Sequence, residues 1–177
     1  MELNELFTLR RSVRAYDETK AVSREDVEQI LEEARMAPSW KNSQTARVYA
    51  AVSTDKLQQV MACLPGFNQN SAAGCGALLV TAYVKDTAGF TAGKADNEPG
   101  NEWGAYDLGL YTSYLCLAAR NHGMDTLIMG LRDADALRDI LNIPENEQIM
   151  AVLSLGFRKG EPVLRPRKSA GEYITIV

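Results

Sequence analysis

The spacing of apolar positions along this 177-residue chain predicts a succession of helices and strands. The capping box Ser23-x-x-Asp26 precedes apolar residues at helical spacing, so we expect a helix that ends before Pro38. Residues 77–84 form a continuous apolar run of strand length, which is typical of a strand buried on both faces. The other expected elements are a short helix face made by Leu3, Leu6, Phe7 and Val13, strands over 47–52, 124–129 and 149–157, a helix from Thr54 to Leu64 that Pro65-Gly66 stops, and a helix from Asp133 to Leu141.

The segment from Asn101 to His122 predicts a helix with apolar residues on every face. Asp107 is the only charged residue between Trp103 and Ala119. Such a helix must be buried in a core, a membrane or a partner. It is too short and too polar for a membrane span, which needs about 20 apolar residues. A small monomer has little depth in which to bury it, so we interpret it as a dimer-interface helix.

The order of these elements indicates an α/β or α+β protein with one mixed sheet. The chain lies within the usual one-domain range of roughly 100–200 residues, and 46% of its residues are apolar. We therefore expect a single domain over residues 1–177. Residues 86–101, which are rich in Gly, Thr, Asp, Asn and Pro, are expected to form a loop.

The overall composition argues against several classes of protein. A net charge of −4 and a sequence pI near 5.1 argue against general nucleic-acid binding. Cys63, Cys75 and Cys116 match no zinc spacing and cannot all pair within one chain, which favours buried thiols in a reducing, cytoplasmic compartment. The N-terminus begins acidic and has no apolar signal region, and no membrane association is expected.

Positive charge is concentrated in two segments far apart in the sequence. Residues 10–14 and 158–168 carry eight of the 19 Lys and Arg and one acid, Glu161, so they sum to +7 while the remainder sums to −11. Arginine side chains and a serine hydroxyl can converge on phosphate oxygens, so the segregation indicates an anion site. The alternative is two solvated basic faces.

The usual catalytic and nucleotide-binding motifs do not occur in this sequence. His122 is the only histidine, so neither a Ser-His-Asp triad nor a histidine metal site can be assembled, and no metal is expected. The sequence has no G-x-G-x-x-G after a strand and no P-loop motif. A phosphate site without an obvious acid, base or nucleophile fits a redox cofactor that performs the chemistry itself.

Two motifs make the class of cofactor more specific. The chain carries Arg10-Arg11-Ser12-Val13-Arg14 near its start, followed by Pro38-Ser39-Trp40-Lys41-Asn42-Ser43-Gln44. With these motifs it resembles the nitroreductase-like flavoproteins, which bind FMN. The resemblance covers essentially all 177 residues, because further family landmarks follow in order at 103–109, 127–130, 155–158 and 165–167.

The resemblance implies an α+β nitroreductase-like fold, with a central mixed β-sheet flanked by helices. It also implies an intertwined homodimer with two flavin sites at the interface. In the family the chain end extends over the partner and adds a strand to its sheet. Residues 173–177 have high β-propensity and no charge, which suits a swapped C-terminal extension.

The family motifs also assign roles to individual residues. By resemblance, Arg10, Arg11, Ser12, Arg165 and Arg167 hold the FMN phosphate and ribityl chain, and Arg14 reaches the pyrimidine edge, where a cation stabilises negative charge at N1/O2. The further expected cofactor contacts are Pro38, Ser39, Trp40, Asn42 and Gln44 across the dimer interface, Asn68 or else Asn70 at the N3/O4 edge, and Ile128, Met129 and Gly130 near N5. Trp40 either crowds one flavin face or simply packs.

By resemblance, the expected function is an FMN-dependent NAD(P)H oxidoreductase. Hydride would pass from reduced nicotinamide through flavin N5 to a small-molecule acceptor, a nitroaromatic, a quinone or an enone-like compound, by a ping-pong mechanism. A second possibility is a flavin-binding or storage protein of the same fold without productive NAD(P)H turnover. A third, a basic module that binds acidic partners or RNA, predicts a protein without flavin.

Overall fold

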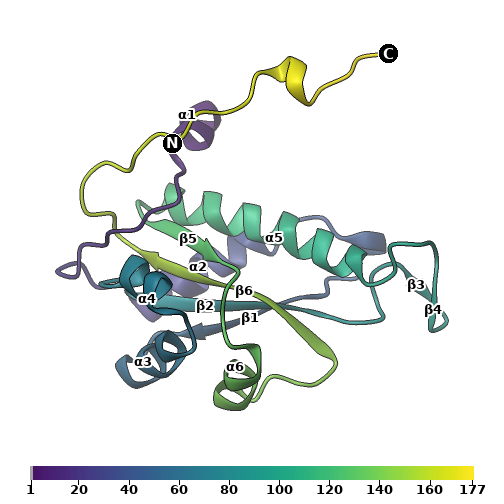
Figure 1. Ribbon diagram of the computed structural model, residues 1–177, viewed down its shortest axis with the longest axis horizontal. Coiled ribbons are helices and arrows are strands. Elements are labelled where there is room, and N and C mark those ends of the chain that lie inside the picture. Colours follow the sequence, from purple (N-terminus) through teal and green to yellow (C-terminus); the bar gives the residue numbers. More distant parts are fainter. Residues whose placement is uncertain (1) are drawn as a thin grey trace.

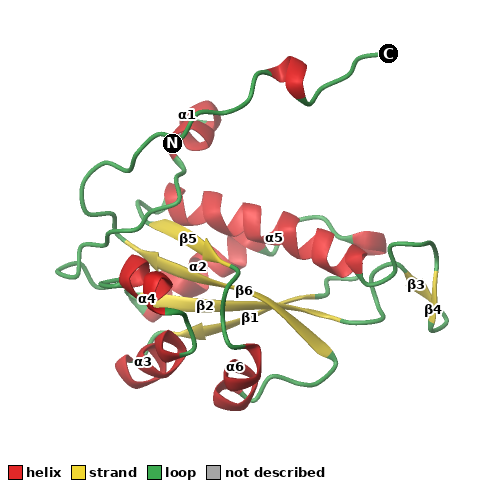
Figure 2. Cartoon of the chain, viewed as in Figure 1, coloured by secondary structure: helices red, strands yellow, loops and turns green. Residues whose placement is uncertain are grey.

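The computed structural model describes residues 2–177 and is built around one antiparallel sheet (Figures 1 and 2). The sheet has the strand order β1-β2-β6-β5. Its strands are β1 (Ala46–Ala51), β2 (Ala77–Val84), β5 (Asp125–Met129) and β6 (Glu147–Gly156), and β3 (Phe90–Thr91) and β4 (Lys94–Ala95) form a separate hairpin. The helices are α1 (Leu3–Leu9), α2 (Arg24–Ala34), α3 (Thr54–Ala62), α4 (Gly66–Ala72), α5 (Glu102–Asn121) and α6 (Ala134–Leu141), with short 3-10 turns at Trp40–Asn42 and Ala170–Glu172.

Helices cover both faces of the sheet. α2 and α5 pack on one face and α3 and α6 on the other (Figure 1). β2 lies in the middle and contributes Leu78 and Val80 to one core and Ala77 and Leu79 to the other. Because both of its faces are covered, β2 consists of apolar residues along nearly its whole length, as the sequence predicted. Each fully buried leucine or valine contributes roughly 1.5–3 kcal/mol.

Several local predictions are confirmed. The capping box forms as expected, because the Asp26 N–H donates to Ser23 Oγ at 3.0 Å and the Ser23 N–H donates to the Asp26 carboxylate at 2.9 Å. β2 spans the predicted residues, and Asp133 caps α6. The N-cap of α3 is Ser53, one residue before the predicted Thr54.

The prediction of a mixed sheet is wrong for the strands of this chain. All three strand pairs of the main sheet are antiparallel. Within residues 2–177, parallel pairing is limited to one isolated bridge between Ser12 and Thr126. The element order could not reveal this, because antiparallel neighbours that are distant in sequence give the same alternation of helix and strand.

Two further segments differ from expectation. Residues 86–101 contain the β3–β4 hairpin, with Ala92 and Gly93 both at positive φ in the turn. After Pro65 the chain continues as α4, with Pro65 as its N-cap.

α5 is buried on one face, and its other face is exposed within this chain. Its buried residues are Gly104, Asp107, Leu108, Thr112, Leu115, Cys116, Ala118 and Ala119, whereas Tyr106 and Tyr114 are 61% and 42% exposed. We expected α5 to be buried on every face, and within this chain only one face is buried.

Candidate functional site

The two basic segments predicted to form an anion site meet in the structure. Residues 7–14, at the end of α1 and beyond, and residues 163–167 line one cavity of about 320 Å³. The predicted residues in its wall are Arg10, Arg11, Ser12, Arg14, Arg165 and Arg167. We call this set the arginine clamp. Its two halves are about 150 positions apart in the sequence, so only the tertiary structure brings them together.

The clamp has an excess of positive charge. Among residues 2–177, no ion pair involves any of its five arginines. Within the described residues, the Arg11 and Arg14 guanidinium groups donate only to the backbone carbonyls of Arg10 and Ser12, at 2.7 and 3.4 Å. A multiply charged anion could therefore bind without first displacing a carboxylate.

Arg158, which belongs to the second basic segment, has a different role. Its guanidinium donates to both carboxylate oxygens of Asp125, at 2.7 and 3.1 Å, and to the Leu9 carbonyl. Asp125 is 1% exposed and also accepts from Arg120 at 2.8 Å. Arg158 thus compensates a buried charge and fixes the end of α1 to β5, so it adds little to the anion site.

The segment after the clamp runs beside β5. The Val13 N–H donates to the Thr126 carbonyl at 3.0 Å, and Ser12 and Thr126 form the parallel bridge. This direction carries Arg14 along β5 toward Ile128. Three predicted residues lie at the end of β5 and just beyond it. Ile128 is 52% exposed, Met129 is buried, and the space in front of Gly130 is open. A flat ring could approach the backbone there.

Asn68 joins this group from α4. It is 8% exposed, and its side-chain amide donates to the Leu131 carbonyl at 3.0 Å. That bond leaves the side-chain carbonyl as a possible acceptor for an N–H group. Asn70 is exposed on the same helix, without a bond to the end of β5. The geometry therefore favours Asn68 over Asn70 as the residue that faces the end of β5.

The predicted residues Pro38, Ser39, Trp40, Asn42 and Gln44 lie elsewhere in the chain. We call residues 38–44 the interface loop. The Trp40 N–H donates to Asp107 near the start of α5 at 2.9 Å. The clamp lies near Cys116 of the same helix, because Ser12 bridges Thr126, whose hydroxyl donates to Cys116 Sγ at 3.2 Å. Asp107 and Cys116 are separated by about 13 Å along the helix axis, so one chain does not bring the two groups together.

The interface loop has an unusual backbone that its own side chains stabilise. Lys41, Asn42 and Gln44 have φ values of 45°, 57° and 50°, a region that costs a non-glycine residue on the order of 1–3 kcal/mol. The Gln44 N–H donates to Ser39 Oγ at 3.0 Å. Such strain persists only where the surroundings fix the conformation, which is typical of ligand-contacting segments.

Sequence reasoning missed Asp107 as a site residue. It is 4% exposed, and burial raises its pKa while the Trp40 N–H bond lowers it. Its position could have indicated a role, because Asp107 is the only charged residue between Trp103 and Ala119 in the sequence. Its carboxylate anchors the interface loop to α5.

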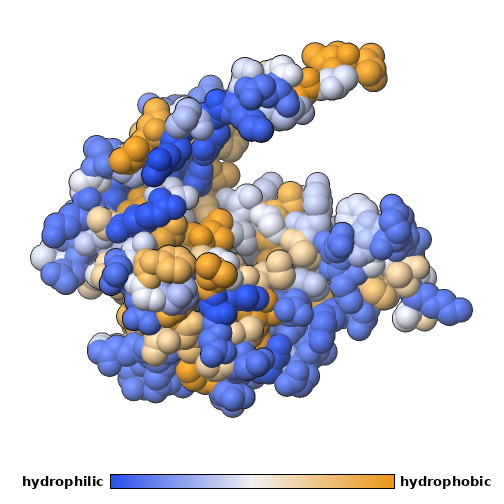
Figure 3. All heavy atoms as spheres, in the orientation of Figure 1, coloured by the Kyte–Doolittle hydropathy of each residue, from blue (hydrophilic) through white to orange (hydrophobic). Residues whose placement is uncertain are grey.

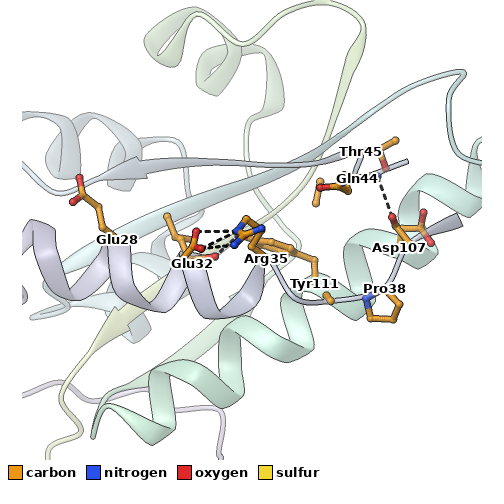
Figure 4. Close-up of a pocket in the computed structure, with 12 residues that line it drawn as sticks. Glu28, Glu32, Arg35, Pro38, Gln44, Thr45, Asp107 and Tyr111 are labelled. Carbon is orange, nitrogen blue, oxygen red and sulfur yellow. Dashed lines mark hydrogen bonds and ion pairs between the residues drawn. The ribbon is translucent and has the colours of Figure 1, made fainter. Parts of the chain in front are cut away.

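A second cavity, of about 370 Å³, opens between α2, α5 and the start of β1. Figure 4 shows Gln44, Thr45 and Asp107 gathered at one end of it, and Glu28, Glu32 and Arg35 along α2. Leu31, Ala37 and Tyr111 contribute apolar wall. Thr45 is 1% exposed, and its hydroxyl has no hydrogen-bond partner within residues 2–177. The cavity thus combines an apolar wall with charged residues of α2 and α5.

Alternative chemistries find little support in the described part of the chain. Residues 2–177 contain no group of three or more His, Cys, Asp or Glu placed to hold a metal ion. All three cysteines are buried and free, and burial raises the pKa of Cys75 to about 11, which disfavours a reactive thiolate. In the same range, no helix is long and apolar enough to cross a membrane.

Comparison with known proteins places the chain in a family. The model of the nitroreductase family matches residues 8–157, so the chain belongs to that family. A relative from Archaeoglobus fulgidus, described as "Putative NADH dehydrogenase/NAD(P)H nitroreductase", is 31% identical over 156 residues that cover 86% of this chain and 83% of the relative. "Putative NAD(P)H nitroreductase YdgI" from Bacillus subtilis is 28% identical over an alignment that covers 86% of each protein.

A solved structure agrees in fold over the whole chain. The crystal structure of a "putative nitroreductase in complex with FMN" from Exiguobacterium sibiricum superposes with a TM-score of 0.88, covering 100% of this chain and 98% of that one. The sequence identity of 24% supports a shared fold and no more.

Proposed function

We propose that this chain is an FMN-dependent NAD(P)H oxidoreductase that reduces small nitroaromatic, quinone or related acceptors by a ping-pong mechanism. The observation that carries the proposal is the arginine clamp, in which five arginines without ion pairs in residues 2–177 surround one cavity beside the open end of β5. Membership of the nitroreductase family supplies the reaction class.

The residues present fit FMN. Arg10, Arg11, Ser12, Arg165 and Arg167 would hold the phosphate and ribityl chain, since the cavity offers several charge-assisted donors and no bound carboxylate. The flat ring would then extend along β5 toward the open space at Gly130. Asn68 would accept from the ring N–H group through its side-chain carbonyl.

FMN, when bound, would supply the two-electron hydride chemistry. The contribution of the protein is orientation and electrostatics. Arg14, carried along β5 by the Ser12–Thr126 bridge, would place positive charge at the pyrimidine edge and stabilise the anion that develops there. The buried thiols, free and unpaired in residues 2–177, suit a reducing, cytoplasmic location, which is part of the proposal.

The proposal includes a homodimer, because one chain separates the clamp from the interface loop. A second copy would place its interface loop over the clamp and complete the site. The outer face of α5 around the half-buried Leu110 and the exposed Tyr114 is the surface that a second copy would cover. Obligate dimers usually bury large, apolar contact areas.

The chain end supports the same proposal. Ile174, Ile176 and Val177 are 50% or more exposed, and this hydrophobic end stands clear of the body (Figure 3). β1 is an edge strand, and the apolar wall of the cavity in Figure 4 lies next to its first residues. We propose that the C-terminal segment of a second copy binds along β1, where it would pair the exposed strand edge.

Absorbance of the purified protein with FMN, followed by NADH and NADPH oxidation with a nitroaromatic or a quinone, tests the proposal. The proposal predicts flavin absorbance bands on the protein. It also predicts parallel lines when the reciprocal rate is plotted against the reciprocal NAD(P)H concentration at several fixed acceptor concentrations. Bound FMN without NAD(P)H oxidation would instead indicate a flavin-storage protein. If the protein binds no FMN, the cofactor assignment is refuted and the clamp is an ordinary basic surface.

A further inference from the structure

An aromatic cluster joins Trp40 of the interface loop to Trp103 and Tyr106 of α5, and no FMN contact was expected for Trp103 or Tyr106. The Trp40 and Trp103 rings are 4.6 Å apart between centroids and are tilted by 45°. The Tyr106 ring meets Trp103 edge-on at 5.7 Å. Tyr106 is 61% exposed, so one side of the cluster faces solvent within this chain. Offset and edge-on contacts of this kind are also those that an additional aromatic ring would make.

The cluster is held rigidly from behind. The Trp103 indole N–H donates to Asn97 Oδ1 at 2.7 Å. Gly89 packs against the same ring, and a side-chain carbon at this position would come within 2.5 Å of Trp103 Cδ1. Gly89 also has a φ of 81°, so the segment before β3 is shaped to receive the indole. The wall is therefore formed before any ligand binds.

Lys41 adds a cation at the edge of this wall. Its ammonium lies 5.6 Å from the Trp40 ring centroid, and it donates to Thr91 Oγ1 at 3.1 Å and to Asp96 Oδ2 at 3.2 Å. Hydrogen bonding by Thr91, and then by Lys41, lowers the pKa of Asp96, so this carboxylate is charged at neutral pH. The Lys41 side chain is 63% exposed, so its ion pair with Asp96 is weak and easily exchanged.

We propose that Trp103, Tyr106 and Lys41 form an acceptor-selecting surface that favours planar aromatic acceptors carrying an anionic substituent. The acceptor ring would pack on the aromatic side chains, and its anion would replace Asp96 as the partner of Lys41. The inference rests on the proposed function, because Lys41 lies between Ser39 and Asn42, which we assign to the flavin of a second copy.

A matched pair of acceptors tests this selection. 4-Nitrobenzoate and 4-nitrobenzamide have nearly the same shape and differ in charge, so the ratio of their kcat/KM values isolates the contribution of the carboxylate. We expect Lys41→Met to lower this ratio about three- to tenfold, Lys41→Arg to preserve it, and Asp96→Asn to raise it several-fold. Lys94→Met, a like change at an exposed lysine of β4, should leave it unchanged.

An unchanged ratio in both Lys41→Met and Asp96→Asn would overturn the inference. Equal losses with both acceptors in Lys41→Met would also overturn it, because they would show that Lys41 only supports the loop. The opposite signs expected for the two variants separate acceptor selection from a general loss of folding.

A binding measurement separates this inference from the proposed reaction. The chain has two tryptophans, and both belong to the cluster, so tryptophan emission, excited at wavelengths that the seven tyrosines hardly absorb, reports on this surface. In the oxidised FMN-loaded protein, 4-nitrobenzoate should quench the emission, with several-fold weaker binding in Lys41→Met. The wild type could oxidise no NAD(P)H and still bind 4-nitrobenzoate more tightly than Lys41→Met does. That result would refute the proposed function and support the acceptor-selecting surface. Quenching that is identical in Lys41→Met and wild type refutes the surface.

Discussion

The arginine clamp and the interface loop are stabilised in opposite ways. The clamp side chains are open, carry no ion pairs in residues 2–177 and rest on two segments outside the sheet. The interface loop has a strained backbone fixed by bonds to Ser39, Asp107 and the β3–β4 region. The difference is that hydrogen bonds within the chain already hold the loop in one conformation, whereas the clamp arginines have no ion-pair partners in residues 2–177 and would gain one in the proposed anion.

We expect the largest effect from a substitution on the outer face of α5. This is the surface through which a second copy would bring its interface loop to the clamp. Leu110→Lys places a charge on the half-buried outer side of α5, and burying an unpaired charge in a dimer interface is strongly unfavourable. We expect insoluble or FMN-free protein, whereas Gln29→Lys, at an exposed position of α2, should remain soluble and yellow. Sedimentation of wild-type protein as a flavin-loaded monomer near 19.5 kDa would contradict the dimer.

Arginines inside and next to the clamp should behave differently. Arg158→Ala leaves the buried Asp125 with one partner fewer, so the free energy of unfolding should fall by about 3 kcal/mol. Arg10→Ala should leave thermal stability near that of wild type and weaken FMN binding ten- to a hundred-fold, from a loss of about 1.5–3 kcal/mol. Urea unfolding and FMN titration measure the two effects. Unchanged FMN affinity in both Arg10→Ala and Arg167→Ala would mean that the clamp is ordinary surface.

Asp107 offers a pH test of the loop anchor. Its pKa is raised by burial, so the folded state binds this proton more tightly than the unfolded chain. Stability due to Asp107 should therefore be greatest below its ordinary pKa and fall as pH rises through the raised value. Other carboxylates titrate in the same range, so the measurement is the difference in unfolding free energy between wild type and Asp107→Asn. A difference that does not change with pH would show that burial does not perturb this group.

The smallest effect compares one serine from each region. Ser39 Oγ accepts the Gln44 N–H, so Ser39→Ala should cost about 1 kcal/mol of stability. Ser12 is exposed, and no side-chain hydrogen bond within residues 2–177 involves its hydroxyl, so Ser12→Ala should affect FMN affinity alone, by a few-fold. Equal thermal shifts in the two variants would remove the distinction between a rigid loop and an open clamp.

Local signals in the sequence predicted much of the fold. The Ser23–Asp26 capping box and the apolar run at 77–84 were confirmed, because each depends on short-range hydrogen bonding or on burial that a few neighbouring residues specify. The antiparallel pairing of the sheet and the hairpin at 90–95 were not predicted, since strand direction depends on partners distant in sequence.

For the candidate site, the sequence by itself determined which residue types are available: an excess of arginine in two segments, a single histidine and one aspartate on an apolar helix. Only the tertiary structure decided how they are used. It brought Arg10 and Arg167 to one cavity, assigned Arg158 to a buried carboxylate, and placed Asp107 and Trp103 behind the interface loop. The physical reason is that a charge acquires its role from the neighbours that desolvate or pair it, and long-range packing selects those neighbours.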